Sequence, residues 1–195
     1  MIKDQKFVGI ALALGDIYTN GGSGKLIQPV DGAIARYIAV RDYLEEFSND
    51  RNSLIICTAG YSKKHPRYAE LLPDYRLGRV VSLAAQLFRY CSERGLRLPL
   101  AYPLCWSTRN ELRIGIKTAL KSFATKDEEV TVVIASNFTH LIRIWLYAKM
   151  YTPKNWKFKL VRARHQFTLM SHLMEIPKII RDLDYALRVW SRLDV

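Results

Sequence analysis

Three polar residues that could bind an anion or transfer a proton stand at and just after the end of one apolar stretch of the sequence. Residues 130–136, VTVVIAS, have the composition of a β-strand, and an apolar stripe at helical spacing follows them. Ser136, His140 and Arg143 stand at this expected junction between strand and helix. A helix cap would explain a short polar residue at such a position, but it explains neither the histidine nor the arginine. Their presence points to chemistry at the start of the helix.

His140 and Arg143 are three residues apart, so both would lie on one face of the helix, near the positive end of its dipole. This arrangement suits a phosphate or a carboxylate. Arg143 would donate a forked pair of hydrogen bonds, the first-turn amides would be further donors, and His140 would act as a donor or as a proton carrier. A lone histidine is more often an ordinary first-turn residue, so this interpretation depends on the neighbours. We expect Arg143 to stay unpaired until an anion binds.

The rest of the chain indicates which elements would position these residues. Strand patterns alternate with helix patterns along the sequence. The expected strands are 6–15, 52–60, 97–102, 130–136 and a basic stretch within 154–165, and the expected helices are 29–48, 77–95, 106–123, the segment after 136, and about 170–193. Such alternation implies right-handed crossovers and a mostly parallel sheet with helices on both faces. We therefore predict a doubly wound, Rossmann-like α/β fold, with residues 1–195 as one domain and strands 6–15, 52–58 and 130–136 at its centre.

Polar residues follow four of these expected strands. In a sheet of this kind ligands bind outside the carboxyl ends of the strands, so these residues would form one site. They are Gly15 after the first strand, Thr58 and Gly60 after the second, Ser107, Thr108, Asn110 and Glu111 after the third, and Ser136, His140 and Arg143 after the fourth. Glycines let the backbone approach a ligand, and hydroxyls and amides hydrogen-bond it. Ser107 or Thr108 would also cap the following helix, with Thr108 and Glu111 at the spacing of a capping box.

The charge balance indicates an anionic partner. The 195 residues include 30 Lys and Arg against 18 Asp and Glu, a formal net charge of +12. Such a balance attracts nucleic acid, an acidic membrane surface or phosphorylated small molecules. The sequence shows no helix-turn-helix, zinc-finger or RNA-recognition signature. Residues 21–25, GGSGK, lack the spacing of a phosphate-binding loop, because Leu26 follows Gly24-Lys25.

The two outer strands have features of sheet edges. Pro99 cannot donate to a strand ladder, which favours an edge position for residues 97–102. In the stretch 154–165, KNWKFKLVRARH, Lys157 and Lys159 alternate with apolar residues. This pattern is typical of a strand with one solvated face, and its lysines protect a sheet edge from pairing with another chain. A basic surface for nucleic acid is the alternative interpretation of the same residues.

Cysteine content and hydropathy bear on the cellular compartment. Cys57, Cys91 and Cys105 are an odd number without metal-ligand spacing, so we expect neither a disulfide framework nor a metal site. No apolar run approaches the roughly 18 to 20 residues of a membrane-spanning helix. The first sixteen residues read as a strand, not as a signal peptide. We therefore expect a cytoplasmic protein.

The order of these residues resembles the ElyC/SanA/YdcF family of bacterial α/β proteins, whose function is poorly defined. The resemblance covers about residues 8–180. It rests on Gly15, on Arg36 in the first expected helix, on Thr58-x-Gly60, on Ser107-Thr108-x-Asn110-Glu111, and on Ser136-x-x-x-His140-x-x-Arg143. Three departures make it a divergent member: Asn110 and Glu111 stand in exchanged order, Thr58-Ala59-Gly60 replaces Ser-Gly-Gly, and residues 78–81 lack a glutamate common there.

The resemblance implies a Rossmann-like fold with a ligand pocket at the strand ends, and S-adenosylmethionine as a ligand of some relatives. Together with the residues it predicts a pocket for a small anionic ligand, phosphate-like or nucleotide-like, although the cofactor itself stays unknown. Hydrolysis of a phosphoester or anhydride is one expectation, with His140 as general acid or base and Arg36, Arg109 or Arg143 stabilising developing charge. A non-catalytic binding module and a nucleic-acid-binding protein are the alternatives. The oligomeric state is left open.

Overall fold

A computed structural model describes residues 5–12, 31–58, 83–102, 107–136, 138–163, 173 and 176–193. The site predictions at Gly15 and Gly60, and the glycine-bearing loop at residues 20–25, lie outside these described residues.

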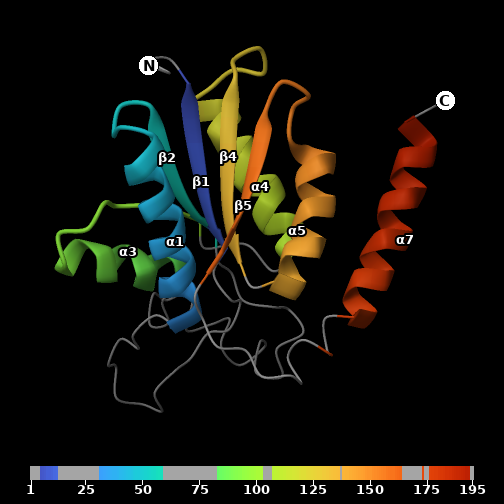
Figure 1. Cartoon of the computed structure of the whole chain (residues 1–195), viewed down its shortest axis with the longest axis horizontal. Coiled ribbons are helices and arrows are strands. Elements are labelled where there is room, and N and C mark those ends of the chain that lie inside the picture. Colours follow the sequence, from blue (N-terminus) through green and yellow to red (C-terminus); the bar gives the residue numbers. More distant parts are fainter. Residues whose placement is uncertain are drawn as a thin grey trace, which may run out of the picture.

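Five strands form one all-parallel sheet (Figure 1). They are β1 Lys6–Leu12, β2 Ser53–Thr58, β3 Leu100–Tyr102, β4 Val130–Ser136 and β5 Lys157–Arg162, in the order β3-β2-β1-β4-β5. The predicted central strands β2, β1 and β4 are therefore confirmed as the interior of the sheet. The two strands that the sequence assigned to edges, β3 and β5, are its edges.

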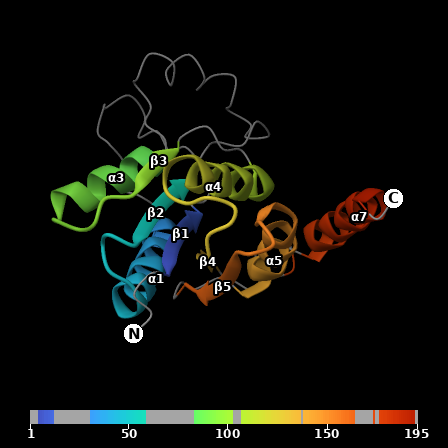
Figure 2. The same cartoon turned by 90° about the horizontal axis from the view of Figure 1, so that it is seen from above.

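Helices cover both faces of the sheet (Figure 2). On one face lie α1, Asp31–Phe47, and α3, Leu83–Glu93. On the other lie α4, Thr108–Ser122, and α5, Phe138–Tyr151. The last helix, α7, Ile176–Leu193, packs against α5 outside this layer. The fold is thus the predicted doubly wound, Rossmann-like α/β architecture.

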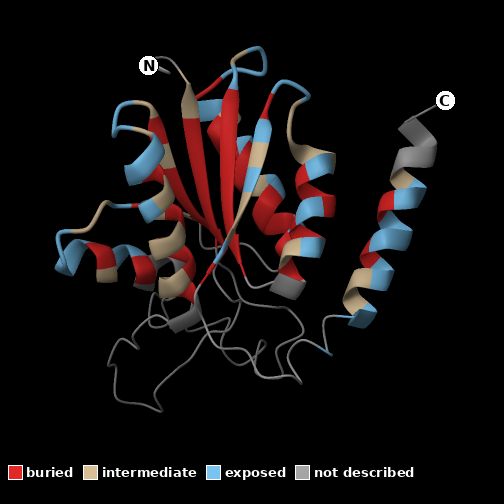
Figure 3. Ribbon diagram, in the orientation of Figure 1, coloured by how far each residue is buried: buried red, intermediate tan, exposed pale blue. Residues whose placement is uncertain are grey.

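The interior strands are buried almost along their whole length (Figure 3). Their sequences are nearly continuous apolar runs because both faces of a parallel sheet are covered by helices. β5 differs: its alternating lysines at 157 and 159 are exposed, while Phe158 and Leu160 pack on the core beside α5. The half-solvated edge predicted from this alternation is confirmed. Among the described helices, none combines the length and apolar character required to cross a bilayer.

Gly9 on β1 marks the closest approach of α1 to the sheet. A Cβ built at Gly9 would overlap a methyl group of Val40 and lie 2.9 Å from Cδ1 of Leu44, both on α1. Only a glycine therefore lets α1 lie this close to the central strand.

We expect Gly9→Ala to lower the free energy of unfolding by about 1 to 3 kcal/mol, because overpacking forces a core helix to shift. Urea denaturation measures the change. Gly95→Ala would be a poor control because Gly95 has a positive φ of 61°. Gly115→Ala on α4 serves instead, because a Cβ there would approach only side-chain atoms of Ile10, no nearer than 3.0 Å, and we expect a smaller loss. A loss at Gly9 below 0.5 kcal/mol would contradict the close approach.

Candidate functional site

The strand register brings polar residues to one level at the carboxyl edge of the sheet. Thr58 pairs with Leu12, and Ser136 follows Ala135, which pairs with Ala11. All three terminal residues therefore stand side by side on adjacent strands. Alternation of side chains places them on the face covered by α4 and α5, since Leu12, Ile56 and Ile134 pack in that core. Thr58, Leu12 and Ser136 thus form one row across the carboxyl edge of the sheet, on the face that these helices cover.

A hydrogen-bonded chain joins three of the predicted residues. The Nδ1 atom of His140 lies 2.8 Å from the Ser136 hydroxyl, and its Nε2 atom lies 2.8 Å from the Thr108 hydroxyl. All three side chains are buried. A neutral imidazole has one N–H donor and one acceptor nitrogen, so one hydroxyl accepts a hydrogen bond from the ring while the other donates to it. A neutral ring therefore has one nitrogen that can accept a proton and one that can donate it.

Ser107 gives α4 its starting point. Its backbone is extended, and its hydroxyl accepts a hydrogen bond from the Asn110 amide at 3.2 Å, so it is the N-cap. Of the two predicted caps Ser107 is therefore confirmed, and the capping box with Thr108 as the cap is wrong, because Thr108 is already helical and its hydroxyl contacts His140. Asn110 is buried, and its side-chain oxygen accepts from Arg113. Ser107 and Asn110 thus have structural roles at this helix end.

Glu111 is a buried carboxyl group next to this chain. Only 6% of its surface is exposed. Burial raises the pKa of Glu111 from 4.5 to about 8, although the positive charges of Arg36 and Arg143 act to lower it. The carboxyl group is therefore mainly protonated at neutral pH, and it can donate a hydrogen bond as well as accept one.

Arg36 reaches the same edge from the opposite face of the sheet. It lies on α1, is 1% exposed, and donates from Nη1 to the backbone oxygen of Leu12 at 2.8 Å. This bond holds the guanidinium at the carboxyl end of the central strand, where its charge acts on Glu111. Arg36, which the family resemblance indicated, is thus buried at the same edge of the sheet as the residues predicted from the strand ends.

Arg143 has a buried partner that the sequence did not reveal. Its Nε donates to Oδ2 of Asp182 on α7 at 2.6 Å. Burial raises the pKa of Asp182, but hydrogen bonds from Arg143 and Tyr147 outweigh it and hold the pKa below its usual value. The expectation that Arg143 stays unpaired until an anion binds is therefore wrong. One feature of the sequence could have indicated this partner: Asp182 lies between the apolar residues Ile179 and Ala186 of an amphipathic helix.

Thr58 places a buried hydroxyl group at the carboxyl edge of the sheet. Its side chain is fully buried, and its Oγ1 has no hydrogen-bond partner among the described residues. Buried hydroxyl groups are normally hydrogen-bonded, because leaving one unpaired costs about 1 to 3 kcal/mol. The buried Thr58 hydroxyl is therefore a candidate hydrogen-bond partner for a bound ligand.

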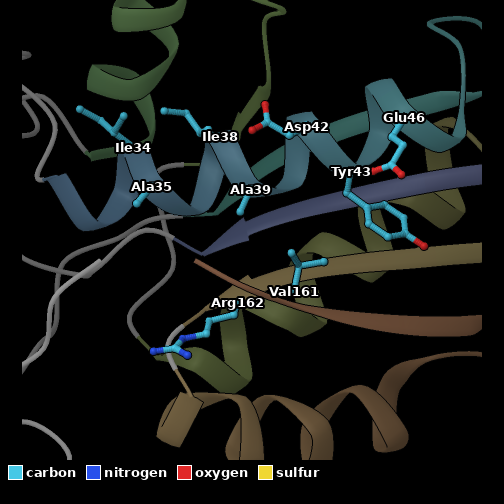
Figure 4. A pocket seen from close by; sticks show the side chains of 9 residues that line it. All are labelled: Ile34, Ala35, Ile38, Ala39, Asp42, Tyr43, Glu46, Val161 and Arg162. Atoms are coloured by element: carbon cyan, nitrogen blue, oxygen red, sulfur yellow. The ribbon is translucent and has the colours of Figure 1, made fainter. Parts of the chain in front are cut away.

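A separate groove of about 680 Å³ lies between α1 and β5, on the opposite face of the sheet (Figure 4). None of the described site residues lines it. Its lining is Ile34, Ala35, Ile38, Ala39, Asp42, Tyr43, Glu46, Val161 and Arg162. Both acidic and apolar side chains face this groove, so its character differs from that of the polar cluster at the strand ends.

The fold and the site define a Rossmann-like α/β protein with a buried polar cluster at the carboxyl edge of its sheet. Comparison of the chain with protein-family models, with curated proteins and with solved structures finds no match. Among the described residues, no group of three or more His, Cys, Asp or Glu side chains gathers closely enough to hold a metal ion.

Proposed function

We propose that this protein binds a small anionic ligand, phosphate-like or nucleotide-like, at the carboxyl edge of its sheet. The observation that supports it best is the grouping of Arg36, Arg143 and a protonated Glu111 beside the chain of Thr108, His140 and Ser136. Fixed cations, hydroxyl groups and helix amino ends are the groups that recognise phosphate and carboxylate oxygens.

The charge of the cluster favours an anion. Asp182 neutralises one of the two arginines, and Glu111 is mainly uncharged below its pKa of about 8. Arg36 and Arg143 thus bring two guanidinium groups to a carboxyl group that is mainly neutral at pH 7. Guanidinium groups bind phosphate and carboxylate oxygens through charge-assisted hydrogen bonds. The Thr58 hydroxyl, which has no hydrogen-bond partner among the described residues, would supply a further hydrogen bond.

The same residues would support hydrolysis of a phosphoester or anhydride. Both ring nitrogens of His140 contact hydroxyl groups, so His140 would take up a proton from an attacking water, or return it to the leaving oxygen, through the Thr108 or Ser136 hydroxyl. Arg36 or Arg143 would stabilise negative charge that develops in the transition state. A protein that binds the ligand without catalysis would use the same groups only to hold the unreacted ligand. In both cases the resemblance to the ElyC/SanA/YdcF family stays a prediction, as does S-adenosylmethionine as one ligand of this class.

The ligand can be identified by mass spectrometry of small molecules that co-purify with the protein, followed by thermal-shift screening of inorganic phosphate, nucleotides, phosphoesters and S-adenosylmethionine. We expect the binding compounds to carry a phosphate or carboxylate and to raise the melting temperature as their concentration rises. Colorimetric detection of released phosphate then separates the hydrolase from the binding module. Nucleic acid that binds with steep salt dependence, while none of these compounds binds, would contradict the proposal in favour of the basic edge at β5.

Arg36→Met tests the pocket directly. We expect the dissociation constant of the best compound to rise ten-fold or more by isothermal titration, because loss of a charge-assisted hydrogen bond costs about 1.5 to 3 kcal/mol. The matched control is Arg188→Met, which removes an arginine that is largely exposed on α7 and should leave affinity unchanged. Both titrations are run at a temperature where circular dichroism shows each variant folded. Equal affinity in the wild type and in Arg36→Met would refute the role of Arg36.

A further inference from the structure

The groove between α1 and β5, here called the α1/β5 groove, takes no part in the candidate site described above. Its apolar lining is formed by Ile34, Ala35, Ile38, Ala39 and Val161. Pockets that hold small molecules are about 300 to 1,000 Å³ and combine an apolar lining with a few polar groups at fixed positions. At about 680 Å³, the α1/β5 groove has the size and composition of such a pocket.

Charged side chains of opposite sign stand toward the two ends of the α1/β5 groove. Arg162 is the last residue of β5, and it makes no ion pair within the described part of the chain. Asp42 and Glu46 lie one turn apart on α1, toward the other end (Figure 4). Arg41 donates only to Oδ1 of Asp42, so Oδ2 and the Glu46 carboxylate have no hydrogen-bond donor among the described residues. The groove therefore attracts an anion at the Arg162 end and hydrogen-bond donors at the other.

The Arg162 end adjoins the candidate site through β4. Arg162 pairs with Ser136 in the register of the two strands, and the amide of Ala163 donates to the Ser136 backbone oxygen at 2.9 Å. Side chains alternate along β5, and Phe158 and Leu160 pack in the core on the face that carries Ser136. The Arg162 side chain therefore starts on that face, next to Ser136, and at the strand end it also lines the groove.

Helix α1 adjoins the candidate site as well. Ala35 of the groove directly precedes Arg36, which donates to the backbone oxygen of Leu12 at 2.8 Å. In a doubly wound sheet, ligands lie across the carboxyl edge where the connections leave neighbouring strands toward opposite faces. Here those strands are β1, followed by α1, and β4, followed by α5. A ligand that is anchored at the strand ends can thus extend into the α1/β5 groove.

We propose that the α1/β5 groove holds the base and sugar of a nucleotide whose phosphate lies at the carboxyl edge of the sheet beside Arg162, and that this base carries an amino group. The inference rests on the proposed function, because the candidate site supplies the anchor for the phosphate. The residues from Ala35 to Asp42 cover about 10 Å of helix, which is comparable with the length of an extended mononucleotide.

The charges of the groove favour this ligand over other partly apolar molecules. The amino group of a base and the hydroxyls of a ribose are donors, which the Asp42 and Glu46 carboxylates accept. A base with a carbonyl oxygen in place of the amino group would bring two acceptors together and lose that hydrogen bond. An acyl chain would cover both carboxylates without giving either a donor, which costs free energy. The half-buried ring of Tyr43 adds an aromatic surface for the base.

Isothermal titration of the full chain tests the groove with inorganic phosphate, ribose phosphate, adenosine monophosphate and inosine monophosphate as probes. We expect adenosine monophosphate to bind about ten-fold or more tighter than ribose phosphate, because its base leaves water for an apolar lining. Inosine monophosphate has an oxygen where adenosine has its amino group. It should bind about ten-fold more weakly than adenosine monophosphate.

The double variant Asp42→Asn, Glu46→Gln tests the acidic end of the groove. It should reduce the preference for adenosine over inosine monophosphate to about three-fold or less, because a neutral amide accepts a weaker hydrogen bond and can donate to the inosine oxygen. The matched control is Glu45→Gln, which removes an exposed carboxylate of the same helix that does not line the groove. This control should keep the preference of the wild type.

Ala39→Phe tests the apolar part of the groove, because the larger side chain would fill it. We expect adenosine monophosphate and ribose phosphate to bind this variant equally, and a general loss of binding cancels in that ratio. Circular dichroism checks that each variant is folded.

Equal affinity of the wild type for adenosine monophosphate and ribose phosphate would overturn the groove proposal and leave the proposed function in place. Equal affinity for the adenosine and inosine compounds, or an unchanged preference in the double variant, would overturn the role of the two carboxylates. Absence of binding by all of the probes would count against the proposed function itself, and the groove proposal would fall with it.

Discussion

Replacing Glu111 with glutamine should raise the free energy of unfolding by as much as roughly 4 kcal/mol at pH 9 and change it little at pH 4. The pKa of Glu111 is about 8 in the folded protein, because the carboxyl group is buried. In the unfolded chain it returns to its ordinary value near 4.5. Each unit by which folding raises a pKa costs about 1.4 kcal/mol once the unfolded chain ionises.

The direction of this pH dependence follows from the sign of the change. A folded pKa above the unfolded one means that the unfolded chain releases its proton first as pH rises. The contribution of Glu111 to stability is therefore fully present below about pH 4.5, falls between pH 4.5 and 8, and is lost above the folded pKa. Glutamine cannot ionise, so Glu111→Gln removes this loss while keeping the size of the side chain.

Urea denaturation of both proteins from pH 4 to pH 9, in a buffer without phosphate, measures the effect as a difference in which other titrating groups cancel. Glu128→Gln is the matched control. Glu128 is a half-buried glutamate at the surface whose pKa is lowered by its hydrogen bond with Lys6. Its contribution runs in the opposite direction, because it is present at neutral pH and lost as pH falls. Identical pH profiles for the wild type and Glu111→Gln would mean that Glu111 ionises normally in the folded protein.

The same carboxyl group should link ligand binding to protons. A bound anion disfavours ionisation of Glu111, so the affinity for a phosphate compound should fall as pH rises above about 8. Phosphate monoesters are already dianions above pH 7, which leaves Glu111 and not the ligand as the group that titrates. In Glu111→Gln this fall should disappear.

Replacing Asp182 with alanine should lower the free energy of unfolding by about 3 to 5 kcal/mol, the usual cost of removing one partner of a buried ion pair. The variant leaves Arg143 buried without its 2.6 Å partner and also removes the acceptor of the Tyr147 hydroxyl. Burial and this hydrogen bond raise the pKa of Tyr147, so its hydroxyl stays a donor throughout the accessible pH range. Arg143→Ala should be destabilising for the converse reason, since Asp182 would then be buried without that cation.

Chemical denaturation at pH 7 gives these values, with Asp184→Ala as the control. Asp184 pairs with Arg188 on the exposed side of the same helix, and exposed pairs of this kind contribute less than about 1 kcal/mol. A double variant with leucine at 143 and 182 should recover most of the lost stability, because an apolar pair of similar size often replaces a buried ion pair without cost. A loss below about 1 kcal/mol for Asp182→Ala would show that α7 does not seal this pair from water.

The two predictions together concern how α7 affects the charge of the candidate site. Asp182 neutralises Arg143 from outside the sheet, while Arg36 carries its charge from the opposite face. The charge that Arg143 presents near Glu111 thus depends on the docking of the last helix, since separation of α7 from α5 would remove Asp182 from it.

The amino-acid sequence alone determined the architecture of this protein. Continuous apolar runs at 6–12, 53–58 and 130–136 can be satisfied only by burial on both faces, which requires helices on both sides of a parallel sheet. Pro99 and the alternating lysines of β5 identified the two edges for reasons of backbone hydrogen bonding and solvation. Because all parallel strands end at one edge, the sequence also indicated that Thr108, Ser136 and His140 would lie near one another.

The partners of the charged residues were decided by the tertiary structure. Nothing in the local sequence connects Arg143 with Asp182, 39 residues away, because an ion pair depends on which faces of two helices meet. The pKa of Glu111 depends on its burial in the folded protein and on charges carried by α1 and α5, so it could not be read from the spacing that suggested a capping box. The tertiary structure also decided which residue caps α4. The Thr108 hydroxyl contacts His140 on another helix, and the Ser107 hydroxyl caps α4 instead.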